Sequence, residues 1–144
     1  MSIERFLKAQ ASDYDTALAE IRAGHKRSHW IWYIFPQLEG LGHSMTAEYY
    51  GISGMEEARE YLAHPVLRQR LVEISKALLE LPVNDAYEVM GSPDNLKLRS
   101  SMTLFALADP SCSVFQQVLD KFFDGKRDGK TEELLGLGRK EDKQ

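Results

Sequence analysis

The 144-residue sequence has few of the features that covalent cross-links or membranes require. It contains one cysteine, Cys112, so it cannot form an internal disulfide or a metal site built from several thiolates. This cysteine usage fits a reducing cytosol. The longest apolar run, Trp30 to Phe35, has six residues, whereas a membrane-spanning helix needs about 20. Charged residues also interrupt residues 1–10, so we expect a cytoplasmic protein with no signal peptide and no membrane segment.

An excess of positive charge is also missing. The formal net charge is -4 and the isoelectric point is about 5.6. General nucleic-acid-binding proteins neutralise many phosphates with a basic face. The negative net charge therefore argues against nucleic-acid binding. The basic residues occur in small clusters, namely Lys26 with Arg27, Lys97 with Arg99, and Lys126 with Arg127. Each cluster would suit a single anionic group on a ligand.

Strand patterns are absent as well, because β-branched residues are scarce and no segment alternates apolar with polar residues. Apolar residues recur instead at intervals of three and four, which is typical of helices with one buried face. We therefore expect one compact all-α domain over residues 1–138, followed by a charged, frayed tail at 139–144. The pattern predicts helices over residues 3–10, 13–23, 54–63, 65–81, 93–108, 113–123 and about 130–135, with short helices after Ser44 and before Met90.

Helix boundaries are predicted from capping residues. Ser53 and Glu56 have the spacing of a capping box, in which each side chain bonds a free backbone amide. Pro65 and Pro93 would occupy first helical turns, where proline costs no hydrogen bond. The expected N-cap residues are Ser12, Ser44, Ser53, Asn84 and Ser92.

Residues 24–37, GHKRSHWIWYIFPQ, place basic residues directly beside aromatic ones. Large aromatic side chains favour a core, and we assign most of the segment to one. Polar groups inside so apolar a stretch need a partner, and aromatic rings beside His and Lys are also typical of ligand pockets. Both interpretations therefore stay open for Lys26, His29, Trp30 and Gln37.

Residues 94–106, DNLKLRSSMTLFA, form the second unusual segment. On a helix, Lys97 and Ser101 would share a face beside the apolar stripe. Small hydroxyls next to Lys97 and Arg99 would suit hydrogen bonding to a ligand. The alternative is a close helix contact, in which each serine bonds the carbonyl four residues earlier.

Metal and nucleophile sites have weaker support. His25 and His29 are four residues apart and could share a helix face, but the H-E-x-x-H arrangement is missing and Gly24 disturbs the helix. We predict no metal site and no cofactor. Cys112 has no neighbouring base in sequence, and Ser44 after His43 is more typical of an N-cap than of a nucleophile.

The motifs HWIWYIFPQLEGLGHS at residues 29–44 and KLRSSMTLFA at residues 97–106 give the chain a family resemblance. It resembles a widespread, mostly bacterial family catalogued as a domain of unknown function, to which the label calpastatin is sometimes attached. The resemblance implies a small all-helical domain with armadillo-like packing and supplies no activity. Its motif positions are Lys26, His29, Trp30, Trp32, Phe35, Pro36, Gln37, Gly40, Gly42, Ser44, His64, Lys97, Leu98, Ser101, Leu104 and Phe105.

The leading hypothesis is a polar cleft between the two motifs that binds a small anionic ligand. If a reaction occurs there, His29 would be its general acid or base. One alternative is a protein-interaction module with a groove near Tyr49 and Tyr50, without catalytic activity. Another is a purely structural role for both motifs. The residues predicted to line the cleft are Lys26, His29, Trp30, Gln37, Lys97, Arg99 and Ser101.

Overall fold

The computed structural model describes residues 2–136, so the predicted tail at 139–144 lies outside the described residues. Within that range the only strand-like pairing is one isolated bridge, and the prediction of an all-α fold is confirmed. No helix among these residues is both long and apolar enough to span a bilayer. The helices are α1 (Glu4–Arg22), α2 (Ile31–Ile34), α3 (Met45–Tyr49), α4 (Met55–Ala63), α5 (Pro65–Leu79), α6 (Ala86–Met90), α7 (Asp94–Ala108), α8 (Val114–Phe123) and α9 (Gly129–Leu134).

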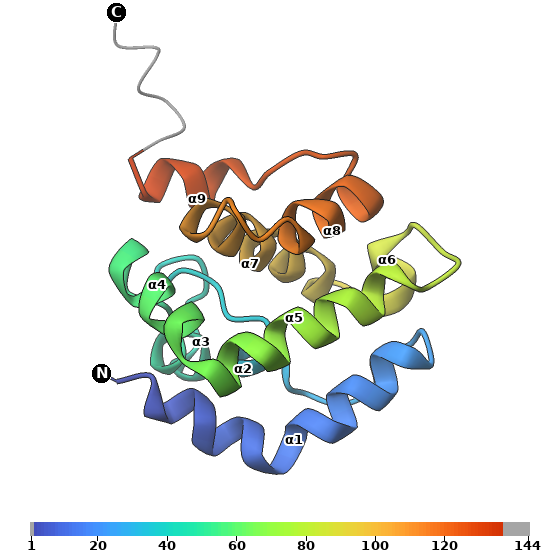
Figure 1. Cartoon of the computed structure of the whole chain (residues 1–144), viewed down its shortest axis with the longest axis horizontal. Helices are drawn as coiled ribbons and strands as arrows, with labels where there is room; N and C mark the ends of the chain where they lie inside the picture. Colours follow the sequence, from blue (N-terminus) through green and yellow to red (C-terminus); the bar gives the residue numbers. More distant parts are fainter. Residues whose placement is uncertain (1, 137–144) are drawn as a thin grey trace, which may run out of the picture.

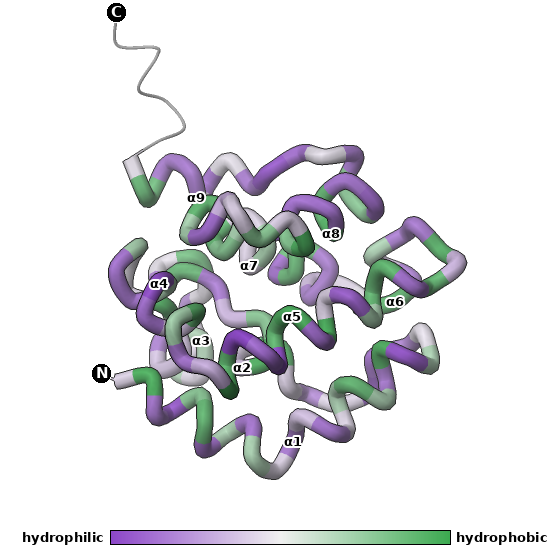
Figure 2. Tube along the Cα trace, viewed as in Figure 1, coloured by the Kyte–Doolittle hydropathy of each residue, from purple (hydrophilic) through white to green (hydrophobic). Residues whose placement is uncertain are grey.

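The helices pack around α7 and α5. Helix α1 packs along α5, and α8 packs against both α5 and α7 (Figure 1). Hydrophobic and hydrophilic residues alternate in short blocks along α1 and α5, as expected for helices with one buried face (Figure 2). Helix α7 differs, because every residue from 100 to 106 is buried. It is enclosed by α2, α4, α6, α8 and α9.

Helix α1 is one continuous helix, so the prediction of separate helices over 3–10 and 13–23 was wrong. Residues 11 and 12, which were predicted to separate the two helices, are helical, and the buried stripe continues past them from Gln10, which is only 2 % exposed, to Tyr14. Ser12 is an exposed residue inside the helix, where its Oγ lies 3.4 Å from the Ala9 carbonyl, and it caps nothing.

The other predicted helix boundaries are partly confirmed and partly wrong. Ser44 caps α3 by accepting a hydrogen bond from the Ala47 amide at 3.0 Å, and Pro65 lies in the first turn of α5, both as predicted. The capping box at Ser53 was wrong, because the N-cap is Gly54. Asp85 rather than Asn84 caps α6, and Ser92 does not cap α7, whose N-cap is Pro93.

A buried ion pair joins α1 to α4. The Arg5 guanidinium bonds the Glu57 carboxylate at 2.9 Å, and the two side chains are only 3 % and 8 % exposed. Arg5 also donates to the carbonyls of Tyr49 and Gly51, each at 2.8 Å. A buried charge is stable only where several partners surround it, and the partners of Arg5 come from α4, from the end of α3 and from the residues just after α3. Arg5 therefore ties the start of the chain to this part of the molecule.

Candidate functional site

The two unusual segments, residues 24–37 and 94–106, meet at Asp94, which is the first residue of α7. Its carboxylate lies 2.8 Å from the Lys26 ammonium and 3.9 Å from the Lys97 ammonium. Lys26 also donates to the Ser28 carbonyl at 2.5 Å and lies 4.8 Å from the centre of the Trp30 ring. Its side chain is only 5 % exposed, so Lys26 holds the 24–30 loop against α7.

The loop that carries His29 is held in turn by Glu20 of α1. One carboxylate oxygen of Glu20 accepts bonds from the amides of Arg27 and Ser28 and from the indole of Trp30, and the other accepts the Ser28 hydroxyl. Burial by itself raises the pKa of Glu20, but these hydrogen bonds outweigh it and lower the pKa to about 2. Trp30 is thereby anchored in the core, where it is 1 % exposed.

Gln37 and Lys97 do come together, on the wall of a pocket of about 220 Å³. Gln37 is positioned by the bridge between Leu38 and Ile52, in which the Ile52 amide donates to the Gln37 carbonyl at 2.9 Å. Lys97 lies 5.4 Å from the centre of the Trp32 ring, and its side chain is 25 % exposed. The wall includes Gln37, Leu41, Leu96, Lys97, Asp128 and Lys130, and we call this space the Lys97 pocket.

The remaining predicted site residues lie elsewhere. His29 is exposed and is not part of the pocket wall. Arg99 donates to the carbonyls of Lys126 and Arg127, at 3.0 and 2.8 Å, and so supports the turn between α8 and α9. Ser101 is fully buried inside the core. Their roles in ligand binding, and that of His29 as an acid or base, stay predictions.

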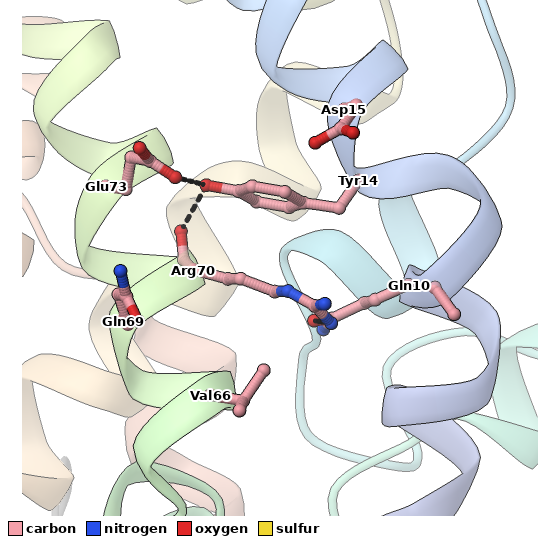
Figure 3. A pocket seen from close by; sticks show the side chains of 8 residues that line it. Gln10, Tyr14, Asp15, Val66, Gln69, Arg70 and Glu73 are labelled. Carbon is pink, nitrogen blue, oxygen red and sulfur yellow. Dashed lines mark hydrogen bonds between the residues drawn. The ribbon is translucent and has the colours of Figure 1, made fainter.

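A second pocket, of about 300 Å³, lies between α1 and α5 and was not predicted (Figure 3). Gln10 projects between the two helices and donates to the Tyr33 carbonyl at 2.7 Å and the Tyr61 hydroxyl at 3.0 Å. Its carbonyl oxygen accepts a bond from Arg70 at 3.3 Å. The sequence signal for this pocket is Gln10 itself, a polar residue in the apolar stripe of α1.

Tyr14 forms another part of this second pocket and donates a hydrogen bond to the Glu73 carboxylate at 2.6 Å. Burial, and then the Glu73 carboxylate, raise the pKa of its hydroxyl, which therefore stays protonated and acts as a donor. We call this second pocket, between α1 and α5, the Arg70 groove.

Across the described residues, no group of three or more His, Cys, Asp and Glu side chains could hold a metal ion.

Comparison with known proteins identifies relatives without a described activity. A family model described as "Protein of unknown function (DUF1810)" matches residues 1–135. The chain is also similar to the crystal structure of the conserved hypothetical protein Rv1873 from Mycobacterium tuberculosis, with a TM-score of 0.91 and 45 % sequence identity. The alignment covers 94 % of this chain and 96 % of that chain. No protein with a curated description matches.

Proposed function

The chain belongs to this family of unknown function, DUF1810, and we propose that its Lys97 pocket binds a small molecule through one anionic group, such as a phosphate or a carboxylate. The observation that carries the proposal is the uneven sharing of Asp94. Its carboxylate is 1.1 Å closer to Lys26, at 2.8 against 3.9 Å, and Coulomb attraction falls with distance. The charge of Lys97 is therefore the less neutralised of the two, and it is also the more exposed.

Two further groups support an anion in this pocket. The Gln37 side-chain amide makes no hydrogen bond to residues 2–136, so it is free to donate to a ligand. Lys130, 60 % exposed, has a distant partner in Glu133 at 4.0 Å. Asp128 is the opposing charge, but one of its oxygens already accepts the Thr131 amide and hydroxyl at 3.0 and 2.7 Å.

The size and lining of the pocket restrict the ligand. Cavities for drug-sized ligands hold about 300 to 1,000 Å³, and this one, at about 220 Å³, is smaller. Leu41 and Leu96 form part of its wall, and Leu96 is 55 % exposed. These features favour one anionic group on a short organic skeleton.

The test is a calorimetric titration with inorganic phosphate and with acetate, at low ionic strength. Lys97→Gln should weaken binding of the preferred anion by about tenfold or more, because a charge-assisted hydrogen bond is worth about 1.5 to 3 kcal/mol. Lys8→Gln is the matched control, since Lys8 is exposed on α1 and the charge change is identical. Equal binding by the two variants, or no binding of either anion by the unmodified protein, would contradict the proposal.

The protein-interaction alternative has one supporting observation on α3. Met45 is 87 % exposed and Tyr49 is 46 % exposed, so two large apolar side chains face solvent on one short helix. Interaction sites usually expose contiguous apolar patches of several hundred Å². Two side chains make a smaller surface than that, and we therefore place this function second to the pocket.

A further inference from the structure

The Arg70 groove combines opposite charges at separate positions. Arg70 reaches from α5 across the groove toward α1, and its guanidinium lies beside Gln10 (Figure 3). Asp15 of α1 and Glu73 of α5 lie on opposite walls of the groove, at the end away from the Arg70 guanidinium (Figure 3). A ligand in the groove would therefore meet a cation at one end and carboxylates at the other.

The guanidinium of Arg70 has unused hydrogen-bonding capacity. It carries five N–H donors, and one of them bonds Gln10 at the long distance of 3.3 Å. No carboxylate oxygen among residues 2–136 lies within 4.0 Å of it. Arg5, by contrast, has its charge matched by Glu57 at 2.9 Å. Arg70 can thus receive a carboxylate in the paired geometry that guanidinium groups favour.

The position of Arg70 is set before any ligand arrives. Gln10 is held by its two bonds to Tyr33 and Tyr61, so its carbonyl oxygen points at Arg70. The guanidinium also lies over the face of the Tyr14 ring, 5.5 Å from its centre. A donor group held in this way loses little conformational freedom on binding.

The carboxylates of the groove disfavour a simple anion. Asp15 is exposed and makes no hydrogen bond or ion pair to residues 2–136. Glu73 uses one oxygen for Tyr14, while the other has only Arg22 at 4.0 Å. Two nearby carboxylates repel a plain anion, and the Arg70 guanidinium repels a plain amine.

We infer that the Arg70 groove binds a free α-amino acid, with its carboxylate on Arg70 and its ammonium group facing Asp15 and Glu73. A zwitterion satisfies both ends of the groove at once. The volume of about 300 Å³ is sufficient for a single small amino acid. This site is separate from the Lys97 pocket and does not depend on the function proposed for it.

The test compares three probes by NMR titration of the uniformly labelled protein. L-alanine carries both charges, propionate lacks the ammonium group and ethylamine lacks the carboxylate. L-alanine should shift the backbone amides around Tyr14 and Arg70 and should bind at least tenfold more tightly than either other probe. That factor corresponds to about 1.4 kcal/mol. Propionate or ethylamine binding as tightly as L-alanine, or no shift with L-alanine at millimolar concentration, would overturn the inference.

Variants then assign the two ends. Arg70→Gln and Asp15→Asn should each weaken L-alanine binding by about tenfold, and the exposed Asp15 can be changed without disturbing packing. The matched controls, Arg59→Gln and Glu60→Gln, change exposed residues of α4 and should bind L-alanine normally. Lys97→Gln should also leave L-alanine binding unchanged, which separates this site from the Lys97 pocket. Normal L-alanine binding by the Arg70 or Asp15 variant would rule out the site.

Discussion

Three hydroxyl residues of α7 use their side chains in different ways. The Ser100 hydroxyl donates to the Leu96 carbonyl at 3.2 Å, and the Thr103 hydroxyl donates to the Arg99 carbonyl at 2.8 Å. Thr103 also accepts a hydrogen bond from the Asp128 amide at 2.8 Å. The Ser101 hydroxyl is buried and has no hydrogen-bond partner among residues 2–136.

Because an unsatisfied buried hydroxyl costs about 1 to 3 kcal/mol, Ser101→Ala should leave stability unchanged or raise it by about 1 kcal/mol. Urea denaturation at neutral pH measures this change. Thr103→Val is the contrasting variant, since it deprives the Asp128 amide of its acceptor and should lower stability by about 1 kcal/mol. A clear loss of stability in the Ser101 variant would show that its hydroxyl does have a partner in solution.

Glu20 makes the stability of the protein depend on pH in the acid range. Its pKa is lowered from 4.5 to about 2, so its stabilising contribution is complete above pH 4.5 and is lost as the pH falls toward 2. At neutral pH, Glu20→Gln should be about 1 to 3 kcal/mol less stable than the unmodified protein. This difference should shrink between pH 4.5 and 2, as followed by urea denaturation at a series of pH values.

Glu60→Gln serves as the control for Glu20, because it removes the same charge from an exposed position on α4. Its stability should match that of the unmodified protein within about 0.5 kcal/mol throughout the pH series. A constant difference for the Glu20 variant across all pH values would contradict a role for the ionised carboxylate.

At the residue scale, the sequence pointed to some positions and could not supply their partners. Gln37 and Lys97 were expected near each other, and the pocket contains both. Trp30 is held by Glu20, a helix residue with nothing in its local pattern to mark it. Such a contact depends on how the chain turns back after α1, which no short sequence window contains.

At the scale of elements, the position of Gln37 depends on two chain segments that lie almost in contact. A Cβ at Gly51 would lie 2.5 Å from the Cβ of Glu39 and 2.7 Å from its Cα. These distances are too short for any real side chain. The bridge between Leu38 and Ile52 therefore requires glycine at position 51.

Gly51→Ala should separate these segments and lower stability by about 1 to 3 kcal/mol, the usual cost of overpacking. It should also weaken anion binding in the Lys97 pocket, because Gln37 would move with the bridge. Thermal denaturation and the phosphate titration measure the two effects. Gly129→Ala is the control, since a Cβ there meets nothing within 4 Å and α9 tolerates alanine.

Helix boundaries show what local pattern can and cannot decide. The cap at Ser44 and the first-turn position of Pro65 follow from backbone chemistry within a few residues, and both were predicted. The continuity of α1 was missed, because Ser12 is a typical N-cap residue and residues 11 and 12 are both on the exposed side of the helix. A serine on the exposed side of a continuous helix has the same local pattern as a serine that begins one.

At the scale of the whole molecule, α7 is the most enclosed helix, with α2, α4, α6, α8 and α9 packed around it. Phe105 is fully buried between the rings of Tyr61 and Phe115, whose centres lie 5.1 and 5.9 Å from its own. The all-α class was predictable from periodicity, because α1, α4, α5 and α8 each bury one side. The central place of α7 was not, since its enclosing helices come from both sides of it in the sequence.

Phe105→Ala should lower stability by about 3 to 5 kcal/mol. If residues 1–138 form one domain, far-UV circular dichroism, which reports helix, and near-UV circular dichroism, which reports aromatic packing, should give the same urea midpoint. Both midpoints should fall together in the variant. Leu96→Ala, at a 55 % exposed position of the same helix, should change little. Two separated midpoints would indicate independent folding units.

The placement of the two tryptophans gives the protein its own optical reporter. Lys97 holds its ammonium group 5.4 Å from the ring of Trp32, whereas Trp30 is sealed in the core beside Glu20. An anion that pairs with Lys97 would change the electric field at Trp32. In a Trp30→Phe background, intrinsic fluorescence would therefore read the occupancy of the Lys97 pocket directly, without an attached dye.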